Sequence, residues 1–280
     1  MKDFIELSYS DLYNAGDLMN VDIVEKLSGM KVKRTKTYAA EMTAIGGALF
    51  GLQYSDSIKR RLAQLIFHII YGKKPVYVWG SGFWHDYNKH RLFRTNLKVL
   101  ALRGAKSAEK LYKLTGVKHD VLLADAGLLV NLLFTPSATK EYKIGLIPHM
   151  SQIDESGMKQ FASMADVHLI DIRHTPAEVG LEISKCEVIA SSSLHGLIFA
   201  DALGVPNMHI MGEKNLREGN FKFEDYYSSY GLEDRPCILS EHIPTYDEII
   251  DSYRIDINAV KDKQKRLAEV FPKELKVAEN

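Results

Sequence analysis

The sequence predicts an α/β protein of two doubly wound, Rossmann-like domains that face each other across a cleft. Short apolar runs alternate with longer amphipathic runs through most of the 280 residues. The alternation is interrupted by the turn-rich stretch "LFTPSATKEY" and then restarts, which indicates a linker between two units. Glycine and polar residues follow the apolar runs, at the sheet edge where such proteins bind ligands.

In the first half, five short apolar runs are expected to be strands and three longer runs helices. The expected strands are "DFIELSY", "AEMTAIGG", "PVYVWGSG", "KVLALRG" and "DVLLADAG". The expected helices are "VDIVEKLSG", "SIKRRLAQLIFHIIYG" and "SAEKLYKLTG". Each helix run ends in glycine, which favours a helix C-terminus there.

The second half repeats the alternation. Its expected strands are "KIGLIP", "VHLIDI", "CEVIAS" and "NMHIMG", and its expected helices are "ESGMKQFASMA", "TPAEVGLEISK" and the run after "CEVIAS". The tail "DINAVKDKQKRLAEVF" has the pattern of an amphipathic helix. We therefore predict an N-terminal domain over residues 1–135, a C-terminal domain over 142–255, and a helix in 256–280 that braces the two.

Composition excludes several functional classes. Acidic and basic residues balance at 36 each, so there is no basic surplus for nucleic acid. The N-terminus has no signal-peptide pattern, and the longest apolar stretch, "LAQLIFHIIY", is too short to span a bilayer. Cys186 and Cys237 are expected to be buried free thiols. These observations favour a cytoplasmic protein.

Common catalytic and cofactor motifs are missing from the sequence. It contains no P-loop, no H-E-x-x-H and no G-x-S-x-G. "GGALFG" and "GSGFWH" do not spell a dinucleotide-binding loop, so their glycines are interpreted as tight turns. His85 and His90 flank Asp86 in a polar segment; these residues could bind a metal, but we interpret the segment as a solvated loop. The sequence therefore predicts no metal site.

The segment Cys186–Asn207 is the most informative. After a buried strand, Ser192 or Ser193 is expected to cap a helix whose apolar stripe leaves Asp201 facing outward. His195 then lies in the first turn, beside free backbone N–H groups and the positive end of the helix dipole. Two interpretations stay open: an anion-binding site with His195 at its edge, or a core histidine bonded to a backbone carbonyl.

These motifs resemble those of the polysaccharide pyruvyltransferases. The resemblance extends over most of the chain in "NAGDLMN", "AIGGAL", "VWGSGF", "LRGAKS", "LADAGLLV", "IGLIPHM", "SSSLHGLIFADALGVPN" and "GNFKFEDYYSSYG". It implies a GT-B-like fold with the active site between the domains. It also implies transfer of pyruvate from phosphoenolpyruvate, a co-substrate, onto two sugar hydroxyls as a ketal, with release of phosphate and without an organic cofactor.

The resemblance also implies roles for individual residues. His195 matches the active-site histidine, Leu194 its neighbour in the donor pocket, and Arg103 a basic residue that holds the donor. Two positions depart from the common pattern: Ser193 stands where arginine is frequent, and Ala126 where proline is frequent. Without that arginine, the donor is expected to be held by Arg103, Ser192, Ser193 and Lys222. His149, Asn14 and Asp17 are candidates for acceptor binding or for a second acid or base.

Two alternatives to this function stay open: a nucleotide-sugar glycosyltransferase on the same fold, and a non-catalytic sugar-binding protein. The family implies a place in capsule or exopolysaccharide synthesis. A lipid-linked acceptor would bring the protein to the inner face of the membrane by peripheral association.

Overall fold

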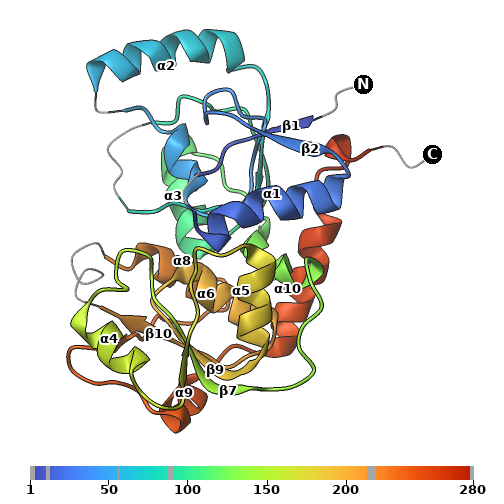
Figure 1. Ribbon diagram of the computed structural model, residues 1–280. Helices are drawn as coiled ribbons and strands as arrows, with labels where there is room; N and C mark the ends of the chain where they lie inside the picture. Colours follow the sequence, from blue (N-terminus) through green and yellow to red (C-terminus); the bar gives the residue numbers. More distant parts are fainter. Residues whose placement is uncertain (1–3, 11–12, 56, 87–90, 213–218, 278–280) are drawn as a thin grey trace.

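The computed structural model describes residues 4–10, 13–55, 57–86, 91–212 and 219–277. Within these ranges the strands form two separate parallel sheets, one in each half of the chain (Figure 1). This confirms the predicted fold class, α/β with two parallel sheets. The predicted domain boundaries themselves stay a prediction.

The first sheet has the strand order β2-β1-β3-β4-β5-β6 within the described ranges. Its strands are β1 (Phe4–Leu7), β2 (Lys31–Arg34), β3 (Met42–Thr43), β4 (Val76–Trp79), β5 (Leu97–Leu102) and β6 (Leu122–Leu123). The helical elements of this half are α1 (Ala15–Ser28), η1 (Ala48–Leu52), α2 (Ile58–Tyr71), α3 (Ala105–Thr115) and η2 (Ala126–Leu132).

The second sheet has the order β11-β10-β9-β7-β8 within the described ranges. Its strands are β7 (Tyr142–Ile147), β8 (Val167–Leu169), β9 (Cys186–Ser191), β10 (Asn207–Met211) and β11 (Cys237–Ile238). The helical elements of this half are α4 (Ser156–Ala162), α5 (Pro176–Ser184), α6 (Leu194–Ala202), α8 (Phe221–Ser228), α9 (Tyr246–Ser252), α10 (Ile257–Glu269) and η3 (Lys273–Leu275).

Local sequence explains where several helices begin and end. Asn14 accepts a hydrogen bond from the N–H of Gly16 and so caps α1, which ends at Gly29 with a φ of 71°. Thr175 and Thr245 each form a capping box with a glutamate three residues later. The sequence pattern placed the start of α1 six residues too late. The first turns lie in the mostly polar stretch Asn14–Asn20, which has little of the apolar periodicity that indicates a helix.

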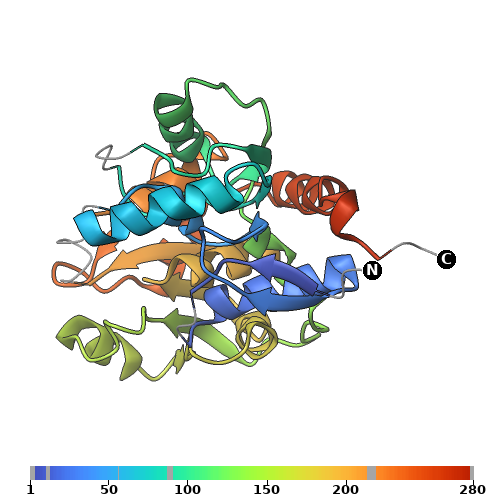
Figure 2. The same cartoon turned by 90° about the horizontal axis from the view of Figure 1, so that it is seen from above.

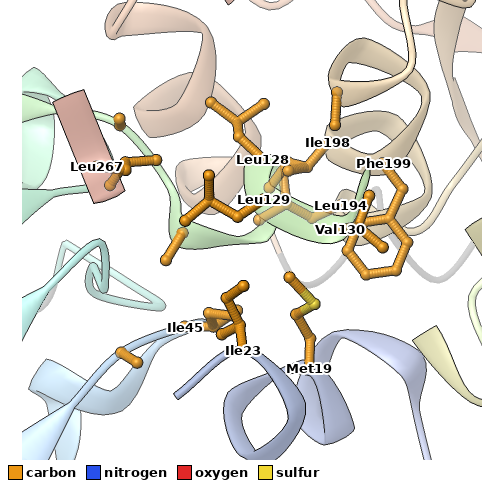
Figure 3. Packing of buried hydrophobic residues seen from close by; sticks show 14 of the residues in the cluster. Met19, Ile23, Ile45, Leu128, Leu129, Val130, Leu194, Ile198, Phe199 and Leu267 are labelled. Atoms are coloured by element: carbon orange, nitrogen blue, oxygen red, sulfur yellow. The ribbon is translucent and has the colours of Figure 1, made fainter. Parts of the chain in front are cut away.

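One hydrophobic cluster joins the two halves. In Figure 3, Leu128, Leu129 and Val130 of η2 lie between residues of α6 and residues of α1, such as Met19 and Ile23. All of these side chains are buried. Because η2 follows the last strand of the first sheet but packs on a helix of the second half, the two halves share one hydrophobic core and do not meet through polar contacts alone.

Helix α10 runs along both halves (Figure 1). Gln264 donates hydrogen bonds to the carbonyl of Leu128 at 2.8 Å and to that of Ala202 at 3.0 Å. The indole N–H of Trp79, in the first sheet, donates to the carbonyl of Leu267 at 3.0 Å. The last long helix is therefore fastened to elements before and after the linker.

Each sheet reverses its strand order at one place. In the first sheet the reversal lies between β1 and β3, and in the second between β7 and β9. The segments that follow these strands leave in opposite directions and so open a crevice at the carboxyl edge of the sheet. A ligand site is therefore expected where the loops after β1, β3, β7 and β9 meet.

Candidate active site

A cleft of about 390 Å³ lies where those four loops meet. The first half contributes Ser8, Tyr9 and Ser10 after β1, the residues Ile45–Ala48 after β3, and Asn14 and Asp17 from the start of α1. The second half contributes His149 and Met150 after β7, Ser193–His195 after β9, and Lys222 from α8. The two places where the strand order reverses, here called the switch points of the sheets, therefore open into one cavity.

His195 lies across the cleft from the first turn of α1. A Cβ placed on Gly16 would lie 1.9 Å from Nδ1 of His195, so the imidazole rests directly on the glycine backbone. The ring also lies 6.2 Å from the ring of Phe199, one turn further along α6. Gly16 is therefore required by the close approach of His195, and the two helix N-termini meet at this contact.

The environment of His195 keeps its imidazole neutral. The pKa of His195 is lowered from 6.5 to about 3; burial is the largest cause, and the positive charges of Arg103 and Lys222 act in the same direction. Its Nε2 atom is buried and, among the described residues, has no hydrogen-bond partner. Of the two interpretations left open by the sequence, a core histidine held by a backbone carbonyl does not fit the unpaired Nε2. A buried, unpaired nitrogen at the edge of a cavity fits a group that meets a ligand.

The three serines before His195 have different partners. Ser193 stands at the N-cap position of α6, but within the described residues no side chain caps this helix. The hydroxyl of Ser191 instead accepts from the N–H of Ser193 at 3.0 Å. Ser193 is therefore the N-cap residue, one of the two expected, but its side chain makes no capping hydrogen bond among the described residues, and Ser191 bonds its N–H from the end of the strand.

Ser192 and Ser193 differ in what they face. Ser193 lines the cleft. Ser192 is fully buried, does not belong to the cleft lining, and accepts a hydrogen bond from the N–H of His149 at 2.9 Å. Ser192 thus joins the loop after β9 to the loop after β7, whereas Ser193 borders the cavity.

Arg103 borders the cleft but is held by a buried network. Its Nε donates to Asp225 at 2.8 Å, and its Nη2 donates to the carbonyl of Phe83. Asp225 also accepts from the N–H and hydroxyl of Ser107, at 2.7 and 2.6 Å. Because Asp225 belongs to α8, this ion pair crosses from one half to the other and fixes the guanidinium at the cleft wall.

The remaining predicted residues also line the cleft. Lys222, Asn14 and Asp17 are half-buried or buried there, and Asn14 is at the same time the cap of α1. The ring Nδ1 of His149 lies 2.9 Å from the hydroxyl of Ser151, two residues later in the same loop. The structure therefore brings every predicted site residue except Ser192 to one cavity.

An exposed tryptophan was missed by sequence reasoning. Trp84 is 53% exposed, lines the cleft, and lies against Gly47, where a Cβ would come 1.6 Å from the indole ring. The glycine pair Gly46–Gly47 is thus more than a turn, since Gly47 makes room for the aromatic face. The signal was present in "GSGFWH", as an aromatic residue four positions after Gly80, the glycine that directly follows β4.

Two carboxyl groups, Asp125 and Asp201, are fully buried and do not line the cleft. Burial raises the pKa of Asp125 to about 7; Arg103 and the N–H of Gly127 oppose this shift, and Asp225 adds to it. Asp201 was expected to face outward, and this is wrong: it is fully buried and accepts from Tyr226, Asn207 and Tyr253. Burial raises the pKa of Asp201 to about 6. Partners distant in sequence make its inward position stable.

The described residues contain no group of three or more His, Cys, Asp or Glu side chains that could hold a metal ion. His90, from the predicted polar loop, lies outside the described residues. Cys186 is buried as expected, but Cys237 is only partly buried, because it lies in the short edge strand β11.

Comparison with known proteins adds the family. The model of the polysaccharide pyruvyl transferases matches residues 28–213, more than half of the chain. The chain belongs to this family. The match covers the loops after β3, β7 and β9 and the helix that carries His195. The resemblance drawn from the motifs is thereby confirmed.

Two related proteins are similar over part of their length. Uncharacterized protein L143 of Acanthamoeba polyphaga mimivirus is 31% identical over 152 residues, which is 50% of this chain and 52% of that protein. Succinoglycan biosynthesis protein ExoV of Rhizobium meliloti (strain 1021) is 26% identical over 160 residues, 57% of this chain and 49% of that protein. The aligned parts thus span about half the length of these relatives.

Two solved structures align along most of the chain. Spinosyn rhamnosyltransferase SpnG is 10% identical, covering 95% of both chains with a TM-score of 0.37. The E. coli ADP-heptose lipopolysaccharide heptosyltransferase II is 12% identical, covering 96% of this chain and 99% of that one with a TM-score of 0.38. At these TM-scores the alignments carry no argument about function.

Proposed function

We propose that the protein transfers pyruvate from phosphoenolpyruvate onto two hydroxyls of a sugar, forming a ketal and releasing phosphate. The observation that carries the proposal is His195, a neutral histidine with an unpaired buried nitrogen at a cleft between two switch points, with cationic side chains beside it. Membership of the pyruvyl transferase family supports the reaction class. The similarity to a succinoglycan biosynthesis protein supports a role in polysaccharide synthesis.

The donor is assigned to the second half. Phosphoenolpyruvate carries a phosphate and a carboxylate, and the first turn of α6 offers backbone N–H groups and the positive end of a helix dipole. The hydroxyl of Ser193 and the ammonium of Lys222 stand at the same cavity. Arg103 adds positive charge from the wall, although its ion pair with Asp225 offsets part of it. Leu194 forms the apolar side of this pocket.

The reaction needs proton transfer at two places. One sugar hydroxyl attacks C2 of the donor, while C3 gains a proton and becomes the methyl group. The second hydroxyl then displaces phosphate from the same carbon. Two hydroxyl protons are lost in all: one ends on C3 and the other leaves with phosphate. In this scheme neutral His195 accepts a hydroxyl proton first, and the anionic donor beside it raises its pKa enough to hold that proton before delivery.

The acceptor is assigned to the first half. Trp84 offers an exposed aromatic face on which a sugar ring can stack, and Ser8, Ser10, Asn14 and Asp17 offer polar groups to hydroxyls. His149 lies between the two sides and is the candidate for a second acid or base. Two hydroxyls on one sugar must both reach C2 of the donor. Because the donor is assigned to the first turn of α6, the acceptor has to enter from the side opposite α6.

The test is the release of phosphate from phosphoenolpyruvate by the purified protein. We expect release only when a suitable acceptor is present, so a panel of free and lipid-linked galactosides is offered, with reactions lacking acceptor as the control. Sugar transfer from a nucleotide-sugar donor in the same panel, without consumption of phosphoenolpyruvate, would instead establish a glycosyltransferase. Binding of the sugars with neither reaction would indicate a non-catalytic binding protein.

A further inference from the structure

Helix α2 exposes its apolar face. Among its 14 residues none is buried, and its six large aliphatic side chains are between 47% and 81% exposed. They recur with helical spacing and form one stripe: Ile58, Leu62, Leu65, Ile66, Ile69 and Ile70. A monomeric protein rarely leaves so continuous an apolar surface in water.

The opposite face of α2 attaches the helix to the protein. Gln64 accepts from the N–H of Ser55 at 2.8 Å and donates to the carbonyl of Gln53 at 3.2 Å. Nδ1 of His68 lies 2.5 Å from the carbonyl of Phe93. Polar side chains thus bind the body while the apolar stripe points away from it, the reverse of an ordinary surface helix. In Figures 1 and 2, α2 lies at the outside of the first half.

Aromatic contacts fix this orientation. The ring of Phe67 stacks on that of Tyr38 with centroids 3.7 Å apart, and the guanidinium of Arg61 lies 5.6 Å from the ring centroid of Tyr54. Rotating α2 to bury its apolar stripe would break these contacts and the hydrogen bonds of Gln64 and His68. The stripe is therefore presented outward by the fold.

The charge around the stripe has one sign. Residues 57–75 contain five lysines and arginines and no acidic residue, whereas the whole chain has equal numbers of acids and bases. The cations are Lys59, Arg60, Arg61, Lys73 and Lys74. A second copy of the chain packed stripe against stripe would bring two such cationic sets together, which is unfavourable. A surface that has an apolar interior below a negatively charged boundary is complementary to both the aliphatic stripe and the cations around it.

We propose that α2 lies in the plane of an anionic phospholipid surface, with its aliphatic stripe in the acyl boundary and its cations at the headgroups. An amphipathic helix with a basic polar face binds membranes in this way. No described helix is long and apolar enough to cross a bilayer, so the contact is peripheral. Binding at α2 does not depend on the reaction in the cleft.

The helix is joined to the cleft wall. Phe50 and Gly51 of η1 line the cleft, and the backbone of Gln53 and Ser55, which follows, is hydrogen-bonded by Gln64 of α2. A membrane-bound α2 therefore holds the acceptor side of the cleft close to the lipid headgroups. This position suits a sugar that is attached to a lipid.

The test is sedimentation of the full chain with vesicles of phosphatidylcholine, alone or mixed with phosphatidylglycerol. We expect binding to the anionic vesicles only, weakened by salt. Exchanging Lys59 and Arg60 for glutamine should weaken partitioning about fivefold for each cation removed. The double variant Leu65→Asp, Ile69→Asp should abolish it, while Val117→Asp and Ile250→Asp, which change exposed apolar side chains outside α2, should bind as wild type.

Three results would overturn the proposal. The first is a wild-type chain that stays in solution with anionic vesicles, and the second is a double aspartate variant that still binds them. The third is a lipid-free dimer, measured by light scattering, that the double aspartate variant separates into monomers; α2 would then be a contact between copies. Because all exchanged residues are exposed, circular dichroism should report an unchanged fold for each variant.

Discussion

Helices α6 and α2 have similar fractions of apolar residues, six of nine in α6 and nine of fourteen in α2, but α6 is buried and α2 is exposed. In α6 every residue except His195 is buried, and the helix holds its one partly exposed residue against the cleft. In α2 no residue is buried, and the polar side chains of Gln64 and His68 face the protein. The comparison teaches that an apolar helix run does not by itself indicate core. The partners of its polar residues decide which face turns inward.

The largest effect is expected where α6 meets the cleft. His195→Ala should lower turnover by roughly 10²–10⁴-fold, the span for a lost acid–base group. His195→Gln should be nearly as inactive, because it keeps a hydrogen bond but cannot move a proton. Steady-state kinetics would measure both, with His242→Gln, an exposed histidine bonded to Glu248, as the matched control. Near-normal turnover of His195→Gln would remove His195 from proton transfer.

The same substitution, isoleucine to alanine, should have different effects on stability in the two helices. Ile198 of α6 is fully buried, so Ile198→Ala should lower the free energy of unfolding by about 2–5 kcal/mol. Ile69 of α2 is 81% exposed, so Ile69→Ala should change it by no more than about 0.5 kcal/mol. Urea denaturation measures both. A large loss for Ile69→Ala would mean that α2 is covered in solution.

The contact between α1 and α6 can be tested from the opposite side. Gly16→Ala places a methyl group where the imidazole of His195 lies, so the ring must move. A displacement on this scale should cost about 10²-fold in turnover. Gly157→Ala, at the second position of α4, is the control, since its Cβ would stand 3.1 Å from Leu239 and outside the cleft lining. Equal kinetics for both variants would contradict the assigned contact.

The last prediction concerns pH. The pKa of Asp125 is about 7 in the folded protein against an ordinary value of 3.8, so the folded state binds this proton more tightly. Its contribution to stability is fully present below the unfolded pKa and is lost as the pH rises through about 7. Asp125→Asn should therefore gain stability relative to wild type as the pH rises from about 4 to above 7. A stability difference that is independent of pH would show that Asp125 is not titrating in this range.

Much of the fold was predictable because the apolar periodicity is strong in the buried strands. The segment "CEVIAS" and the helix after it were predicted as strand and helix, and His195 was placed in the first helical turn, all as found. Short edge elements such as β2 and β11 carry too little apolar sequence to be recognised by pattern. Helix α8, which supplies Lys222 and Asp225, was likewise not predicted as a helix.

The errors at the site share one physical cause. Asp201 was placed outward because a helical wheel cannot show Tyr226 and Tyr253, which come from later helices or loops. Ser193 is the N-cap residue of α6, as one of the two serines expected, but the capping hydrogen bond expected of its side chain is missing from the described part of the chain, and the hydroxyl of Ser191 bonds its N–H from the strand. For Arg103, expected to hold the donor, the sequence could not show that Asp225 pairs with it from 122 positions away. Local patterns identify polar residues, and only the fold supplies their partners.

The most direct measurement is the NMR titration of the His195 imidazole with and without phosphoenolpyruvate, its signal assigned by comparison with His195→Gln. Without the donor, the pKa of about 3 predicts no titration between about pH 5 and 8. With the donor bound, its phosphate and carboxylate should stabilise the imidazolium and raise that pKa into or toward this range. An imidazole signal that phosphoenolpyruvate leaves unchanged, or a pKa near 6.5 in the empty protein, would contradict the account.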